Sequence, residues 1–115
     1  MTRVEFDALC AAHPGATLSG PGELVAWKVG GKMFACIGVS NDGVSVKTPD
    51  IETASLLIEM GRAHRAPYFH KSWVRVPWGL VDADEMRDRL NISYGLVRGG
   101  LTKKFQATLA PWPLP

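Results

Sequence analysis

One short segment of the chain combines aromatic rings with basic side chains. The segment APYFHKSWVRV, residues 66–76, carries three rings and three basic or ionisable groups: Tyr68, Phe69, His70, Lys71, Trp73 and Arg75. Cations neutralise the phosphates of nucleic acids, and rings stack on the bases of single strands. The alternative is that the rings anchor a loop and a strand in the core while the cations stay in solvent. Taken alone, this segment favours that alternative.

The remaining reactive side chains form no catalytic or metal-binding pattern. The histidines lack the spacing of metal ligands, and the sequence has neither a paired-cysteine motif nor an HExxH helix. Cys10 and Cys36 have no base close in sequence, and no GxSxG nucleophile motif occurs. We therefore expect a protein that is not an enzyme and that needs no metal or other cofactor.

Acidic residues and glycine pairs have structural explanations. Asp82, Asp84 and Glu85 stand at the expected start of a helix, where carboxylates accept hydrogen bonds from free N–H groups and complement the helix dipole. The Gly-Gly pairs at 30–31 and 99–100 lack the GxxxxGK and GxGxxG patterns of phosphate-binding loops. A hairpin turn and a helix end explain them more simply.

The chain has the size and composition of a single globular domain. It has 115 residues, of which 46% are hydrophobic and 21% are charged. A formal net charge of +2 permits an anionic partner but does not require one. The distribution of charge is more informative, because residues 61–81 contain no acidic side chain and every charged residue after Asp88 is basic. The second half of the chain is therefore expected to carry a positive surface.

The cysteines and the N-terminus favour a cytoplasmic protein. Cys10 and Cys36 each lie in an apolar stretch and are expected to be buried free thiols, which suits a reducing compartment. The N-terminal residues MTRVEFDA lack the apolar core of a signal peptide, and no apolar run is long enough to span a membrane.

Hydrophobic periodicity and turn residues predict an α+β fold. Helices are expected at residues 3–12, from 50 to about 60, and from 83 to about 98. The first follows a capping box of Thr2 and Glu5, the second opens at Pro49 and Asp50, and the third follows the cap residue Asp82. Residues 24–29, 32–39 and 44–48 are predicted to form a three-stranded antiparallel meander. Residues 73–77 are predicted to form a fourth strand at the edge of the sheet, since Pro77 lacks a backbone donor. We expect one domain over residues 1–104, followed by an irregular tail containing proline and tryptophan at 105–115.

The predicted meander places two rings and two cations on one face. A two-residue turn at 30–31 pairs Trp27 with Phe34, and Lys32 and Lys47 then fall on the same face. The opposite face is more uniformly aliphatic, so it is the better candidate for packing against the helices. In this hypothesis Trp27 and Phe34 are exposed. Ordinary packing in the core is the favoured alternative for both rings, and a register shift of one residue would reverse the two faces.

Four motifs in a fixed order resemble a known family. They are VAWKVGGKMFACIG, VSVKTP, PYFHKSWVRV and LNISYGLVRGGLTKK. In this order they resemble the MmcQ/YjbR family of small bacterial proteins over nearly the whole chain, up to about Lys104. The resemblance implies an antiparallel sheet packed by helices, similar to the double-wing and frataxin-like folds. It also implies DNA binding, which is attributed to family members by structural likeness to a phage transcription-factor domain. The recurrent family positions fall on Lys32, Lys47, His70, Lys71, Trp73, Tyr94, Lys103 and Lys104.

The leading functional hypothesis is a non-enzymatic DNA-binding-like domain. The candidate contact residues are Lys32, Lys47, His70, Lys71, Trp73, Arg75, Lys103, Lys104, Trp27 and Phe34. The first alternative is a protein-interaction module that uses the edge strand near Trp73 or the C-terminal tail. The second alternative is a metabolite-binding protein or an enzyme, which a deep pocket would favour.

Overall fold

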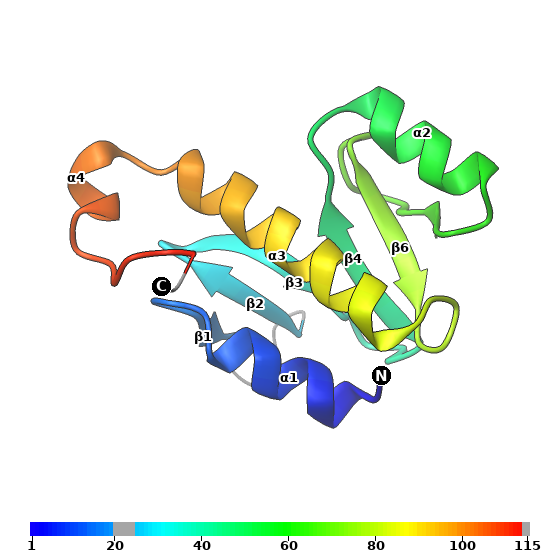
Figure 1. Cartoon of the computed structure of the whole chain (residues 1–115), viewed down its shortest axis with the longest axis horizontal. Coiled ribbons are helices and arrows are strands. Elements are labelled where there is room, and N and C mark those ends of the chain that lie inside the picture. The colour runs from blue at the N-terminus through cyan, green and yellow to red at the C-terminus, as the bar shows by residue number, and fades with distance from the viewer. Residues whose placement is uncertain (20–24, 114–115) are drawn as a thin grey trace.

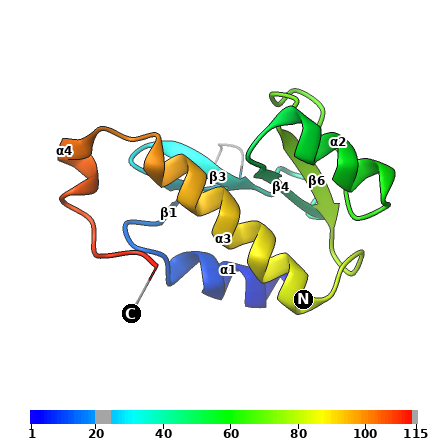
Figure 2. The same ribbon diagram turned by 45° about the horizontal axis from the view of Figure 1, so that its top comes forward.

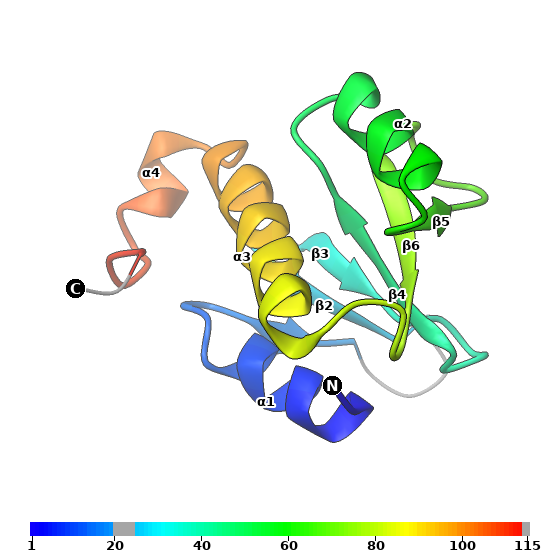
Figure 3. The same ribbon diagram turned by 45° about the vertical axis from the view of Figure 1, so that its right-hand side comes forward.

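The computed structural model describes residues 1–19 and 25–113, and within them six strands form one antiparallel sheet. The elements are α1 (Arg3–Ala11), β1 (Thr17–Leu18), β2 (Ala26–Val29), β3 (Lys32–Cys36), β4 (Gly43–Lys47), α2 (Ile51–Glu59), β5 (His64–Arg65), β6 (Trp73–Pro77), α3 (Ala83–Gly99) and α4 (Lys103–Gln106). The strand order is β1-β2-β3-β4-β6-β5. Helices α1 and α3 lie side by side over the sheet, and α2 lies beside β5 and β6 (Figures 1, 2 and 3). The predicted α+β class with an antiparallel sheet is confirmed.

Helix starts follow the capping residues in the sequence. Thr2 and Glu5 form a reciprocal capping box, with Glu5 N–H donating to Thr2 Oγ1 at 3.2 Å and Thr2 N–H donating to Glu5 Oε1 at 3.1 Å. Asp50 accepts from Thr53 N–H at 2.7 Å at the start of α2, and Asp82 accepts from Glu85 N–H at 2.8 Å at the start of α3. The predicted helix starts are confirmed.

The β2–β3 hairpin has the predicted turn but not the predicted register. Gly30 and Gly31 adopt φ angles of +57° and +78°, which a two-residue hairpin turn requires. A bulge then shifts the pairing between Trp27 and Lys28, so that Trp27 lies opposite Ala35 instead of Phe34. The predicted start of this strand at Leu24 lies outside the described residues.

Trp27 and Phe34 are core residues, so the prediction of two exposed rings was wrong. Trp27 is 8% exposed and donates its ring N–H to Asp7 Oδ1 of α1 at 2.8 Å. Phe34 is fully buried and packs edge-on against Tyr94 of α3, with ring centroids 5.2 Å apart. The bulge changes the alternation of side chains that the simple hairpin register assumed.

The strand β6 is interior, which corrects the prediction of an edge strand. It pairs with β4 over five residues and with the two-residue strand β5 on its other side. Pro77 is tolerated because it is the last residue of β6. In the described part of the chain the sheet ends at β1 and β5, each two residues long, which leaves little edge for another strand to join.

A serine from α3 separates β3 from β4 at one end of their pairing. The two strands pair directly through Ala35 with Val46 and through Cys36 with Ser45. Beyond these pairs, Ser93 Oγ donates to Phe34 C=O at 2.6 Å and accepts from Lys47 N–H at 2.8 Å. The hydroxyl thus satisfies two backbone groups at the point where the strands separate.

The C-terminal segment packs on the rest of the fold. After α4, residues 107–113 form no helix or strand. The Trp112 ring nevertheless packs against Gly95 of α3, and its centroid lies 5.0 Å from that of the Tyr94 ring. Leu101 and Phe105 pack against the turn at Gly30, so α4 lies near the β2–β3 hairpin.

Candidate functional site

A groove of about 990 Å³ lies over strands β3, β4 and β6. Side chains alternate along each strand, so Val44, Val46, Val74 and Val76 are fully buried in the core while their neighbours face the groove. The groove-facing residues of these strands include Cys36, Ser45, Lys47, Trp73 and Arg75. Two loops, 38–42 and 67–70, contribute further lining residues. The face of the sheet that carries this groove is thus the one opposite the valine core.

The separation of β3 from β4 lets α3 line one end of the groove. The groove is lined there by Leu96 and Val97, which follow Ser93 along α3, and by Gly100, the residue that ends the helix. Lys32 and Met33 of β3 line the same end. An apolar surface therefore borders cationic side chains. Concave apolar sites with a few polar groups are typical of ligand-binding sites.

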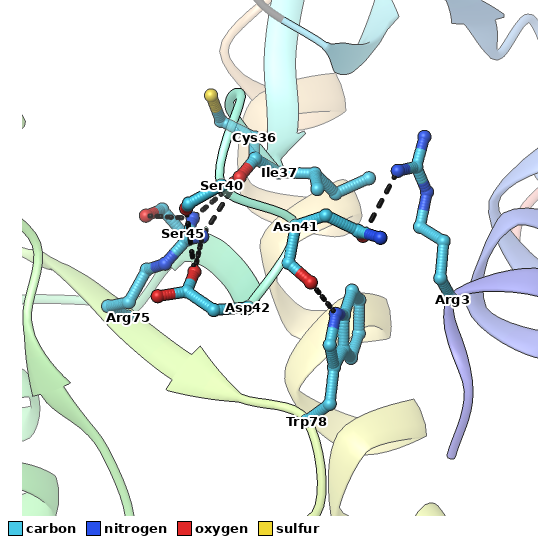
Figure 4. A network of polar contacts seen from close by, with 9 residues as sticks. All are labelled: Arg3, Cys36, Ile37, Ser40, Asn41, Asp42, Ser45, Arg75 and Trp78. Carbon is cyan, nitrogen blue, oxygen red and sulfur yellow. Dashed lines mark hydrogen bonds and ion pairs between the residues drawn. The ribbon is translucent and has the colours of Figure 1, made fainter.

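Arg75 lines the groove and is held in four contacts (Figure 4). Its Nη1 donates to Cys36 C=O at 3.0 Å and to Ser45 Oγ at 3.4 Å. Its Nη2 donates to Ile37 C=O at 2.9 Å and to Asp42 Oδ1 at 2.5 Å. The side chain is 18% exposed. Arg75 therefore fastens the 38–42 loop to the sheet and has little capacity left for a ligand.

Asp42 is the only carboxylate among the described residues that line the groove. Hydrogen bonds from Arg75 and from Ser40 lower the pKa of Asp42. Next to it, Asn41 has a φ of +53°; its side chain accepts from Arg3 at 3.2 Å and its carbonyl accepts from the Trp78 ring N–H at 3.0 Å. The loop is therefore fixed from both sides, and the Asp42 carboxylate is paired with Arg75.

Three rings gather where the 67–70 loop meets β6. Phe69 and Trp73 are stacked, with centroids 4.8 Å apart and an angle of 30° between the planes. Tyr68 is fully exposed and has a φ of +72°, a left-handed conformation that is uncommon for a bulky residue. All three also line a second hollow of about 260 Å³ on the other side of the loop.

Cations with no carboxylate partner in the described residues line the same two hollows as these rings. Within the described residues, neither Lys32 nor Lys47 of the groove, nor Lys71 of the second hollow, takes part in an ion pair. His70 Nδ1 accepts from Ser72 N–H at 3.1 Å, so the neutral ring carries its proton on Nε2 and can donate from there. These groups can bind an anion that has planar or apolar parts.

The structure brings together about half of the predicted contact residues. Five of them line the groove: Lys32, Lys47, His70, Trp73 and Arg75. Lys71 lies in the adjacent hollow, and Lys103 and Lys104 lie on α4 outside both linings. Trp27 and Phe34 are sealed in the core and cannot serve as ring contacts.

Sequence reasoning missed several lining residues. Tyr68 and Phe69 belonged to the aromatic segment but were not chosen as contacts, and their interleaving with basic residues was the available signal. Asp42 stood in a predicted turn, but its pairing with Arg75, 33 residues away, has no local signature. Leu96 and Val97 reach the groove only because the strands separate.

Other reactive groups show no activated state. Burial raises the pKa of the Cys10 thiol and that of the Cys36 thiol, so neither is disposed to form a thiolate. No three histidine, cysteine or acidic side chains in residues 1–19 and 25–113 are grouped closely enough to hold a metal ion. None of the helices described in that same part of the chain has the length and apolar character needed to cross a membrane.

Comparisons with known proteins give a family and a related fold. No match to the chain is found among curated proteins. The crystal structure of Deinococcus radiodurans protein DR2400, with a DUF419 domain, is similar to it at a TM-score of 0.80 and 26% sequence identity, over 93% of this chain and 86% of that one. The YjbR family model matches residues 8–96, more than half of the chain, which confirms the resemblance seen in the motifs. The chain belongs to the YjbR family.

Proposed function

We propose that this protein is a non-enzymatic nucleic-acid-binding protein and that the groove is its binding site. The observation that carries the proposal is that Lys32, Lys47 and His70 line the same groove as the stacked pair Phe69 and Trp73. These residues come from β3, β4, β6 and the loop before β6. Phosphates would contact the cations, and the sugar and base parts would contact the rings and the apolar end of the groove.

The electrostatics of the groove favour an anion. Asp42 already pairs with Arg75, whereas the two groove lysines have no carboxylate partner in the described residues. An incoming phosphate would therefore meet uncompensated positive charge. Because the groove itself offers only about two or three cations, we expect weak binding in the groove with a slope of log K against log salt near roughly −2.

The setting we propose for this activity is the cytoplasm. Cys10 and Cys36 are both free and buried, and a reducing compartment preserves such thiols. Cytoplasmic nucleic acid would then be within reach of the groove.

Fluorescence anisotropy with labelled oligonucleotides tests the proposal. Titrations of single-stranded and double-stranded DNA at about 25 mM and 150 mM salt should give saturable binding at the lower salt and clearly weaker binding at the higher. Absence of binding to both forms at the lower salt would refute the nucleic-acid function.

A second candidate, a small anionic ligand with a planar body, is supported by the lining. Met33, Leu96 and Val97 make one end of the groove apolar, and its volume falls within the range of small-molecule sites. Calorimetry with a mononucleotide and with an oligonucleotide of the same base separates the candidates. Equal affinity per site for the two would favour the small ligand, whereas a clear gain with chain length would favour nucleic acid.

The features that suggested a protein-interaction module are used within the fold. β6 is paired on both sides, and Trp112 of the tail packs against Tyr94. A protein partner is therefore not the function that this geometry supports best.

A further inference from the structure

We infer that the nucleic acid bound here is single-stranded and that it passes from the groove over Tyr68 into the second hollow. The inference rests on the proposed function and names the form of the ligand and its path. It depends on three observations: the position of the rings, the backbone conformation of Tyr68, and the charge of the second hollow.

The rings of the site can stack only on unpaired bases. Phe69 and Trp73 line a concavity instead of standing on a flat surface. In a duplex the base faces are already stacked on one another and the phosphates lie outside. A single strand can turn its bases toward such rings, which is how sequence-tolerant single-strand sites work.

Tyr68 occupies a position that favours glycine. Phe69 N–H donates to Ala66 C=O at 3.4 Å, and Pro67 and Tyr68 are the two central residues of this turn. A turn with proline first and a positive φ second is of type II, and its second central residue is normally glycine or asparagine. Here the fold holds a fully exposed tyrosine in that conformation. The turn therefore presents a ring to solvent, at a cost in conformational strain, between two hollows.

The second hollow continues the chemistry of the groove. It shares Tyr68, Phe69 and Trp73 with the groove, and it adds Arg65 and Lys71. Neither of these two cations is in an ion pair, and no carboxylate lines the hollow among the described residues. A strand that leaves the groove across Tyr68 would thus meet further positive charge for its next phosphates. The complete path would hold a short segment, near the lower end of the roughly 4–16 nucleotides that single-strand binding folds engage.

Tyr68→Gly is a test variant that is not expected to disturb folding. Glycine suits the left-handed backbone of this turn, so the variant removes the ring and keeps the loop. We expect the wild-type protein to bind a thymidine octamer at least about tenfold more tightly than a DNA hairpin with a stem of about eight base pairs, and Tyr68→Gly to weaken octamer binding by about tenfold. Tyr68→Phe, which retains the ring, should bind the octamer like the wild type.

A charge variant tests the path separately. The double variant Arg65→Ala with Lys71→Ala should weaken binding of the octamer but leave binding of a trimer, which fits in the groove alone, within about twofold. Equal affinity for duplex and single strand, or octamer binding by Tyr68→Gly equal to that of the wild type, would overturn this inference while leaving a nucleic-acid function in place. Absence of binding to any oligonucleotide would refute the proposed function itself.

Discussion

The two faces of strands β4 and β6 consist of alternating residues of the same short segments, but they have different roles. On one face, Val44, Val46, Val74 and Val76 are fully buried under the helices. On the other face, the intervening residues include a lysine, a tryptophan and an arginine that line the groove. The valine face fixes the register of the strands, and this register in turn fixes where each groove residue points. Stability and binding are therefore expected to respond to different substitutions.

The largest stability effect is expected on the core face. Phe34→Ala removes a fully buried ring that packs against Tyr94, so it should lower the free energy of unfolding by about 3–5 kcal/mol. Urea denaturation measures this change. Val39→Ala is a suitable control because Val39 is 90% exposed, and it should change the value by less than about 0.5 kcal/mol. Similar losses for the two variants would show that the assignment of the core face is wrong.

A smaller loss of stability is expected at the point where β3 and β4 separate. Ser93→Ala removes the hydroxyl that bonds Phe34 C=O and Lys47 N–H, so it should cost about 1–3 kcal/mol. Hydrogen exchange should also show weaker protection of the Lys47 amide. Ser55→Ala, at an exposed position on α2, serves as the matched serine control. Unchanged protection of the Lys47 amide in Ser93→Ala would contradict the bridging role.

On the groove face, removal of Tyr68 should not reduce stability. Tyr68→Gly relieves a left-handed tyrosine but adds freedom to the unfolded chain, so the free energy of unfolding should stay the same or rise by up to about 1 kcal/mol. Denaturant titration checks this. A decrease in the free energy of unfolding of more than about 1 kcal/mol would mean that the Tyr68 ring stabilises the fold, which would contradict a role in ligand binding alone.

The smallest expected effect is a pH dependence of stability that comes from Asp42, which lines the groove. Because hydrogen bonds from Arg75 and Ser40 lower the pKa of folded Asp42, its contribution to stability is present above the unfolded pKa of about 3.9 and is lost as pH falls through the folded value. The Tm of Asp42→Asn should therefore lie below that of the wild type near neutral pH. The difference should shrink in acid.

Thermal unfolding of both proteins from pH 7 down to about pH 2 measures this difference. Glu5 and Asp50, whose pKa values are also lowered by their cap hydrogen bonds, are present in both proteins and contribute equally. A constant difference in Tm across the whole range would contradict the role of the charged Asp42.

Local signals in the sequence predicted the elements better than their pairing. Thr2, Asp50 and Asp82 marked three helix starts because a capping side chain bonds N–H groups two or three residues away. Gly30 and Gly31 marked the hairpin turn for a similar local reason. The bulge beside Trp27 depends on packing against α1 and α3, and no short motif encodes it. The short strand β5 falls below the length at which alternation can be recognised.

The sequence predicted the residue types of the candidate site but not their arrangement. The mixture of rings and cations in residues 66–76 was visible in the sequence, and Trp73 and His70 do line the groove. The role of Arg75 was not visible, because its carbonyl partners at Cys36 and Ile37 lie 39 and 38 residues away. Composition suggested a phosphate contact, whereas the fold uses this guanidinium mainly to hold a loop.

The central claim is that the groove face, and not the basic surface of α4, binds nucleic acid. Two double variants remove the same charge: Lys32→Ala with Lys47→Ala in the groove, and Lys103→Ala with Lys104→Ala on α4. Anisotropy titrations with a single-stranded octamer should show about tenfold weaker binding for the groove variant and a salt slope reduced by about 1.4, with less than about twofold change for the α4 variant. Equal weakening by the two variants would contradict the claim.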